Sequence, residues 1–147
     1  MQRHGPTGGG AANPLNLPID NGPSREGRRH NLVVDGSYLL PFDFQVAGIW
    51  KETSGAPYQW TSLYTPYHRL EPRGGRRGEW QHKVDLRVTK NVKLPRGMGL
   101  MGFWEMFNAL NTRNFGTHNG SMESSQVLQV TSAQAMRRRQ LGIRFDF

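Results

Sequence analysis

Five histidines and two arginine-rich stretches are the groups in this 147-residue sequence best suited to chemistry. The histidines stand at positions 4, 30, 68, 82 and 118, and no two have the H-x-x-x-H spacing of a zinc site. The chain contains no cysteine, which excludes disulfides, thiolate metal sites and cysteine nucleophiles. Neither a G-x-S-x-G elbow nor a Walker loop occurs. We therefore predict that the chain is not an enzyme and has no metal site and no cofactor.

The arginine-rich stretches could instead bind anions. The sequence RGGRRGEW at 73–80 is similar to arginine–glycine segments that bind nucleic acid, but a single copy is more typical of a solvated loop. Arg137, Arg138 and Arg139 could pair with lipopolysaccharide phosphates, because a guanidinium matches phosphate with two hydrogen bonds. The alternative is a solvated strand start whose charges prevent edge pairing. The formal net charge of +8 favours anionic partners in either case.

These charged groups are positioned by stretches in which apolar and polar residues alternate, a period typical of β-strands. KVDLRVTKNVKL at 83–94 alternates most clearly, and QLGIRFDF at 140–147 follows the same rule. The pattern predicts strands at about residues 30–41, 43–53, 82–94, 99–109 and 137–147. Lys90 interrupts the apolar face of its strand, which indicates either a β-bulge or a lysine that extends towards an interface.

The connections between these strands alternate in length. Residues 1–29 are rich in Gly and Pro and predict a loop or disordered lead-in before a domain at 30–147. Within that domain, Pro41–Asp43 and Pro95–Gly99 are short turns, whereas 53–80 and 108–135 are long polar segments. Outer-membrane barrels place short periplasmic turns and long extracellular loops at opposite ends. We therefore predict an all-β fold, an antiparallel up-and-down meander of about five strands that forms the C-terminal part of a transmembrane β-barrel.

Helical membrane spans and a secretory leader are not predicted. No apolar run approaches the roughly 18 residues of a membrane helix. The opening MQRHGPTGGG has no apolar h-region, so we expect either a cytosolic protein or a piece of a longer frame whose signal lies elsewhere. Membrane strands escape the hydropathy test for helices, because their signal is weaker.

Several short motifs carry a resemblance to a known family. Gln140, Gly142, Phe145 and Phe147 have the types and spacing of the β-signal of bacterial outer-membrane proteins. The sequence FNALNTRNF supplies Phe107, Asn108, Leu110, Asn111, Asn114 and Phe115, and an earlier hairpin supplies Tyr38, Leu40, Pro41, Ser54, Gly55, Pro57 and Tyr58. Over roughly residues 28–147 the chain resembles the C-terminal end of TonB-dependent outer-membrane receptors, in particular the OmpA-like or carboxypeptidase-regulatory-like group.

The resemblance implies a location in the outer membrane of a Gram-negative bacterium, in contact with lipid and lipopolysaccharide. It also implies recognition of Gln140, Gly142, Phe145 and Phe147 by the barrel assembly machinery. Receptors of this family have barrels of about 22 strands with a plug in the lumen. The chain is thus expected to be a fragment that closes the barrel of a parent, which would bind or import an unknown solute. TonB would act only through a plug that these residues lack.

Charged residues within the predicted strands are expected to face the lumen of such a barrel, because a charge on lipid costs a few kcal/mol near the midplane. We expect them to pair across strands, with a solute path as the functional alternative. The predicted lumen charge network contains Asp85, Arg87, Glu105, Arg144 and Asp146.

Two other hypotheses remain open. The chain could be a soluble basic β-domain that binds nucleic acid or polysaccharide, in which case binding should weaken steeply with salt. It could also be a non-functional remnant. Under the barrel hypothesis, no nucleic acid partner is expected.

Overall fold

The chain folds almost entirely into antiparallel β-structure. The computed structural model describes residues 16–24, 26–64 and 68–147. Two compact units can be distinguished. Unit 1 lies within Met1–Arg28, Ala56–Gly78 and Gly116–Thr131, and unit 2 comprises Arg29–Gly55, Glu79–Phe115 and Ser132–Phe147.

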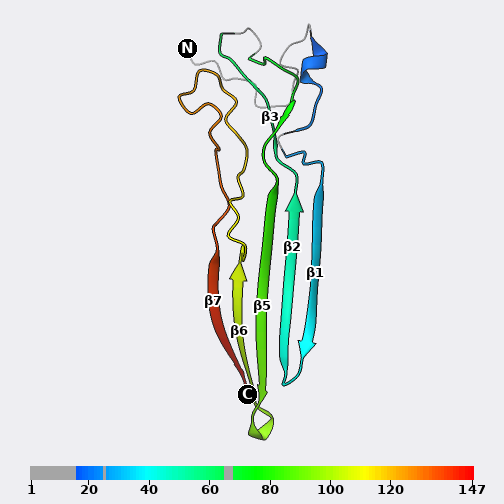
Figure 1. Cartoon of the computed structure of the whole chain (residues 1–147), viewed down its shortest axis with the longest axis vertical. Helices are drawn as coiled ribbons and strands as arrows, with labels where there is room; N and C mark the ends of the chain where they lie inside the picture. Colours follow the sequence, from blue (N-terminus) through cyan, green and yellow to red (C-terminus); the bar gives the residue numbers. More distant parts are fainter. Residues whose placement is uncertain (1–15, 25, 65–67) are drawn as a thin grey trace. The chain divides into compact units, whose positions relative to one another are not determined.

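Unit 2 contains a five-stranded sheet (Figure 1). Its strands are β1 (Asn31–Leu40), β2 (Phe44–Thr53), β5 (Gln81–Lys93), β6 (Gly99–Phe107) and β7 (Arg138–Asp146). The spatial order is β1-β2-β5-β6-β7, and each neighbouring pair is antiparallel. The predicted antiparallel five-stranded arrangement is confirmed, and the predicted boundaries differ from these by at most two residues. The sheet is not closed, because β1 and β7 are its two edges.

Short turns join the strands at one end of this sheet. Pro41, Phe42 and Asp43 connect β1 to β2, and Phe42 and Asp43 have positive φ angles of 65° and 60°. The 3-10 helix η2 (Pro95–Gly97) lies in the turn between β5 and β6. The other two connections, from β2 to β5 and from β6 to β7, are long. The expected alternation of short and long connections is therefore present.

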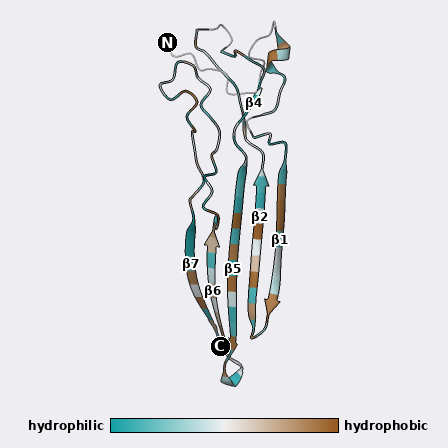
Figure 2. Cartoon of the chain, viewed as in Figure 1, coloured by the Kyte–Doolittle hydropathy of each residue, from teal (hydrophilic) through white to brown (hydrophobic). Residues whose placement is uncertain are grey.

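The register of the strands places apolar and charged side chains mainly on opposite faces of the sheet. Val34 is opposite Trp50, which is opposite Val84, and Val88 is opposite Trp104, which is opposite Leu141. Because side chains alternate along a strand, all of these lie on one face of the sheet, which we call the apolar face. Hydrophilic and hydrophobic bands accordingly alternate along β5 in Figure 2.

Unit 2 buries polar residues in place of an apolar core. Among its described residues, the buried side chains are all polar: Thr53, Ser54, Gln81, Thr89, Asn108 and Asn114. Large apolar side chains are exposed instead, with Leu141 at 82% and Ile143 at 79% of their full accessible area. An extended exposed apolar surface marks a face that contacts another molecule or a membrane.

Unit 1 is built from the stretches predicted to be polar loops. It contains the 3-10 helix η1 (Leu17–Asp20) and the two-residue strands β3 (Pro57–Tyr58) and β4 (Arg76–Arg77), which pair with each other. Isolated bridges join Thr61 to Arg69 and Ser121, and His118 to Val130. Residues 1–15 of the predicted lead-in lie outside the described residues. Across the described ranges, no helix combines the length and the apolar character needed to span a membrane.

Candidate functional site

The apolar face of unit 2 contains one cation near its middle strand. Lys90 lies on this face opposite Phe44 on one side and Gly102 on the other. The pairing continues through Lys90 without an extra residue, so the β-bulge that the sequence allowed is absent. The Lys90 ammonium donates a hydrogen bond to the Phe42 carbonyl and lies 4.5 Å from the centre of the Phe44 ring. The lysine thus reaches the short turn between β1 and β2, where its charge is satisfied.

The opposite, polar face contains an ion pair between neighbouring strands. Arg87 on β5 is directly opposite Glu105 on β6, and Arg87 Nη1 lies 3.0 Å from Glu105 Oε1. The other carboxylate oxygen of Glu105 accepts a hydrogen bond from the Gln140 amide on β7. Three strands are therefore joined through Glu105, whose side chain is mostly buried, with 15% of its area exposed.

The remaining residues of the predicted lumen charge network pair locally. Asp85 contacts Lys83 at 2.7 Å, two residues away on the same strand, and accepts the Asn108 amide hydrogen. Arg144 and Asp146 pair in the same way within β7, at 2.9 Å. The structure therefore brings only Arg87 and Glu105 together across strands. That any of these residues faces a lumen stays a prediction.

Gly142 provides space for an aromatic ring on the polar face. It lies directly opposite Phe103, and a Cβ atom at position 142 would collide with the end of the Phe103 ring. The Arg87 guanidinium lies 4.5 Å from the centre of the same ring, within the range of a cation–π contact. The arginine, the ring and the glycine backbone thus stack across β5, β6 and β7. Aromatic cover of a glycine in a neighbouring strand is a known device for fixing register.

The four residues of the predicted assembly signal divide between the two faces. Gln140 and Gly142 lie on the polar face, where they contact Glu105 and Phe103. Phe145 is opposite Leu100 on the apolar face, and its ring stacks on Phe147 with the centroids 6.1 Å apart. The polar pair therefore fixes β7 to β6, while the two phenylalanines are exposed to the surroundings.

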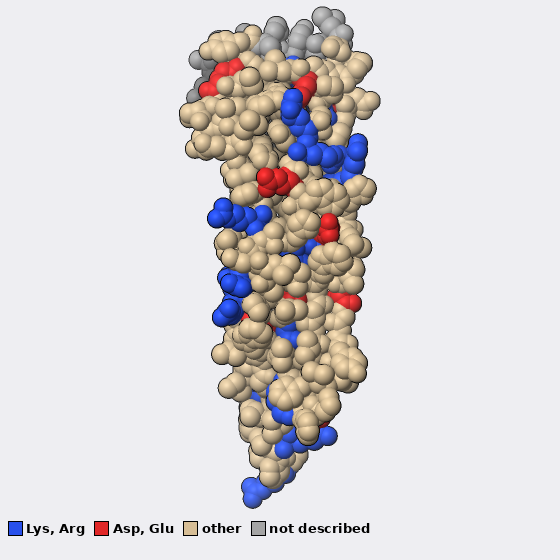
Figure 3. Space-filling view, viewed as in Figure 1, with Lys and Arg blue, Asp and Glu red and all other residues tan. Residues whose placement is uncertain are grey.

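The three consecutive arginines do not converge on one site. Arg137 donates its backbone N–H to the Asn111 side chain, at 3.1 Å. Arg138 and Arg139 are adjacent in β7 and so point to opposite faces, and Arg138 lies 5.8 Å from the centre of the Phe107 ring. Figure 3 shows basic side chains along the β7 side of the sheet. A single phosphate held by all three arginines does not fit this arrangement, although separate contacts do.

Asparagines explain much of the FNALNTRNF motif. Asn108 and Asn114 are almost completely buried, each with 1% of its area exposed. The Asn114 side-chain amide accepts a hydrogen bond from the His82 N–H and donates one to the His82 carbonyl, both at 2.8 Å. It thus pairs with the backbone of β5 as a residue of a neighbouring strand would. Asn108 and Asn111 have positive φ angles of 51° and 55°, which asparagine tolerates better than most residues. The motif matched by sequence is thus a structural turn, and its buried hydrogen bonds could not be assigned without the strand pairing.

The histidines are distributed among separate contacts. His30 stacks on Trp80 with the ring centroids 5.8 Å apart, and His82 Nδ1 lies 3.6 Å from Glu52. His118 packs against Tyr58 in unit 1, with the centroids 5.1 Å apart. Within the part of the chain that the structure describes, no group of three His, Asp or Glu side chains could hold a metal ion.

An acidic side chain holds two segments of unit 1 together. Glu123 accepts hydrogen bonds from the Ser62 hydroxyl and from the Leu63 N–H, the latter at 3.1 Å. The hydrogen bond from Ser62 is the main cause that lowers the pKa of the Glu123 carboxyl below its ordinary value. Because the folded pKa is depressed, the contact contributes stability above the ordinary pKa and loses it as the pH falls through the folded value.

We therefore expect the NMR shift of the Leu63 amide to titrate as the pH is lowered into the acidic range, with a midpoint below that of an ordinary glutamate. The Ser62→Ala variant removes the main stabilising hydrogen bond, so its midpoint should move upward. Identical midpoints in the two proteins would contradict the assigned contact.

No protein-family model, curated protein or solved structure matches this chain.

Proposed function

We propose that unit 2 is a segment of a transmembrane β-barrel whose apolar face contacts lipid. The observation that carries this proposal is the largely apolar face across β1, β2, β5, β6 and β7, combined with ion pairs on the opposite face. Lys90 interrupts this apolar face within β5, and Glu52, His82 and Arg139 lie on it only near strand ends. A soluble sheet would cover such a face with a second layer of side chains. Lipid covers it without a second layer, and the polar face then lines a lumen.

The strand lengths and connections support the same proposal. Four of the five strands contain 9 or 10 residues and β5 contains 13, near the roughly 9–11 residues that a tilted membrane strand needs. Short turns at one end and long segments at the other match the periplasmic and extracellular sides of outer-membrane barrels. We accordingly assign the long segments, including the start of β7 with its arginines, to the lipopolysaccharide side.

The two edges of the sheet indicate what closure requires. With five antiparallel strands, β1 and β7 run in the same direction and cannot pair with each other in antiparallel fashion. An odd number of further strands is therefore needed to close an antiparallel barrel, which agrees with the even strand numbers of bacterial barrels. Unpaired edges in hydrocarbon would leave backbone groups without partners, at several kcal/mol each.

We further propose that the complete barrel belongs to a TonB-dependent receptor of a Gram-negative bacterium, as the sequence resemblance implies. Such a parent would bind or import a solute, and TonB would act through its plug. The residues described here would close the barrel and present Gln140, Gly142, Phe145 and Phe147 to the barrel assembly machinery. The competing hypothesis is a basic β-domain that binds polyanions, supported by the net charge of +8.

Nitroxide scanning of β7 in lipid vesicles tests the proposal. The chain has no cysteine, so single variants such as Leu141→Cys and Ile143→Cys can be labelled without background. We expect labels at these positions to be accessible to oxygen, which dissolves in lipid, because both lie on the apolar face. Labels at Gln140→Cys and Arg144→Cys, on the polar face, should be accessible to a water-soluble nickel chelate.

The four labelled positions lie on the two faces of a single strand. The polar-face positions 140 and 144 are therefore the control for the apolar-face positions 141 and 143. An accessibility with a period of two that favours oxygen at 141 and 143 supports lipid contact. High nickel accessibility at all four positions would mean that both faces are in water. In that case the barrel proposal fails and polyanion binding becomes the better hypothesis.

A further inference from the structure

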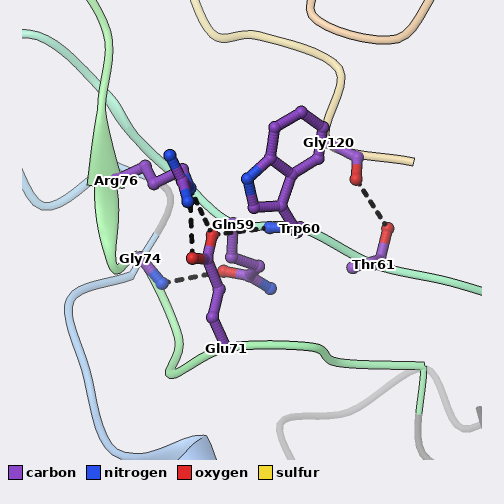
Figure 4. Close-up of polar contacts among 7 residues, drawn as sticks. All are labelled: Gln59, Trp60, Thr61, Glu71, Gly74, Arg76 and Gly120. Carbon is purple, nitrogen blue, oxygen red and sulfur yellow. Dashed lines mark hydrogen bonds and ion pairs between the residues drawn. The ribbon is translucent and has the colours of Figure 1, made fainter. Parts of the chain in front are cut away.

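Several polar groups that join the segments of unit 1 pair with one another (Figure 4). The Gln59 side chain accepts a hydrogen bond from the Gly74 N–H at 2.8 Å. Glu71 accepts hydrogen bonds from the Trp60 N–H at 2.8 Å and from Arg76 Nε at 3.0 Å. These contacts are internal to unit 1 and require no partner molecule.

The outer edge of β7 in unit 2 carries backbone groups that the sheet does not use. Among the described residues, β7 pairs with β6 alone. Backbone N–H and C=O groups point alternately to the two sides of a strand, so those that point away from β6 have no strand to bond. Every residue of β7 except Gly142 is exposed. Such an edge is a template for pairing with another chain, and its unpaired groups are especially costly in hydrocarbon.

The sequence of β7 is complementary to itself when two copies run antiparallel. In the register centred on Gly142, residues at equal distance on either side of this glycine lie opposite each other. Arg138 of one copy is then opposite Asp146 of the other, and this ion pair occurs twice. Opposite charges and apolar pairs stabilise facing strands. The remaining opposite pairs are Leu141 with Ile143, Gln140 with Arg144, and Arg139 with Phe145.

This register also continues both faces of the sheet. Opposite positions differ by an even number of residues, so each pair joins side chains of the same face. Leu141 and Ile143 meet on the apolar face, and Arg138 and Asp146 meet on the polar face. A two-fold pair of this kind uses the same surface on both copies.

The charges of β7 select this register over its neighbours. A slip of one residue sets apolar-face positions against polar-face positions. Centring the pair on Leu141 puts Arg138 opposite Arg144, which is destabilising because like charges face each other. Centring it on Ile143 leaves Arg138 beyond the paired residues. The edge charges, which ordinarily prevent pairing, therefore permit it in one arrangement.

The other edge of the sheet lacks this specificity. Asp35 is the single charged residue of β1. Pairing two copies of β1 around Gly36 would place Asp35 opposite Ser37, so no ion pair selects a register there. The complementary edge is thus that of β7.

We propose that β7 binds β7 of a second copy of this chain, as a two-fold antiparallel pair centred on Gly142. The two copies run in opposite directions, so copies that cross a membrane in the same direction cannot form this dimer, and it belongs to the chain before insertion. It occupies the edge that closure of the proposed barrel requires, and dimer and closed barrel therefore exclude each other. Only this regulatory consequence rests on the proposed function, since the complementarity of β7 does not depend on lipid.

Sedimentation of the full chain in density-matched detergent micelles tests the proposal. We expect a reversible dimer. Arg138→Asp and Asp146→Arg each place like charges opposite each other at two pairs, and each should raise the dissociation constant at least about tenfold. Lys51→Asp reverses the same charge on β2, which β5 and β6 separate from β7. This control should leave the dissociation constant unchanged.

The two charge reversals complement each other, which distinguishes a lost contact from a misfolded variant. An equimolar mixture of the Arg138→Asp and Asp146→Arg proteins restores opposite charges at both pairs of a mixed dimer. The double variant does the same within one sequence. Both should return to within about threefold of the original dissociation constant, because the strand backbone and the apolar pairs are unchanged.

Three results would overturn the proposal. They are a monomer up to about 100 μM protein, single variants that associate like the original chain, and a lost dimer that neither the mixture nor the double variant restores. Edge pairing covers neither face of β7, so the nitroxide pattern of β7 is the same in monomer and dimer. A failed dimer with that pattern intact overturns this inference alone, whereas a charge-dependent dimer with all four labels in water supports it while the barrel proposal fails.

Discussion

Replacing Gly142 with valine will destabilise the attachment of β7 to the sheet by about 2 kcal/mol, in the range typical of overpacking. The new side chain would occupy the space of the Phe103 ring, which lies directly opposite. The ring would have to leave Gly142, and the contact with the Arg87 guanidinium would be lost with it. The free energy of unfolding in detergent micelles, measured by urea titration, reports the loss. Amide exchange at Ile143 and Arg144 should increase at the same time.

Gly102→Ala is the matched control for this substitution. Gly102 lies next to Phe103 on β6, and nothing lies within 4 Å of a Cβ atom added there. We therefore expect Gly102→Ala to be neutral or slightly stabilising, since alanine restricts the unfolded chain. Gly142→Ala should be destabilising, and combining it with Phe103→Ala should reduce that cost, which a double-mutant cycle measures. Equal effects of alanine at positions 102 and 142 would show that the ring contact does not determine the role of the glycine.

The strands were predictable because the physical signals that specify them are local. Alternation along KVDLRVTKNVKL fixes which residues share a face of the sheet. Each of the two short turns begins with a proline, which is followed by residues suited to turns. The sequence also places Arg87 and Glu105 on one face. It does not reveal that they are opposite each other while Asp85 pairs within its own strand, because that depends on register.

Unit 1 could not be predicted for a related reason. Its strands are two residues long, and its contacts join residues such as Thr61 and Ser121, which are far apart in the sequence. No period signals such pairing, so the stretches appear only as polar loops. The glycine at 142 was recognisable as part of a motif. Its physical role, however, follows from Phe103 on the neighbouring strand.

The buried asparagines of FNALNTRNF show how a motif can be recognised without its cause. Asn108 donates to the carbonyl oxygens of Thr112 and Ala135, at 2.9 and 3.3 Å, and accepts from the Thr112 N–H at 3.0 Å. It closes its own turn and holds that turn against the segment that leads into β7. Its φ of 51° adds a second requirement, because an L-residue with a Cβ atom is strained there unless its side chain compensates.

Asn108→Ala is therefore expected to lower the free energy of unfolding by about 4 kcal/mol. About 3 kcal/mol comes from the three hydrogen bonds, at about 1 kcal/mol each. About 1 kcal/mol comes from alanine in a left-handed conformation. Asn108→Gly loses the same hydrogen bonds but tolerates the positive φ, so it should cost about 3 kcal/mol and thereby separate the two contributions. Urea titration in micelles provides the measurement for both variants.

Asn119→Ala would not serve as a comparison, because the Asn119 side chain is half-buried and also bonds Ser121 and Ser124. Asn91→Ala is better matched, since it lies within β5 and its side chain is exposed. That variant should lose less than about 1 kcal/mol, as surface substitutions usually do. If Asn108→Ala and Asn91→Ala cost the same, the buried hydrogen bonds do not hold this turn. If the alanine and glycine variants at 108 are equal while both are costly, the hydrogen bonds account for the whole effect and the φ angle contributes nothing.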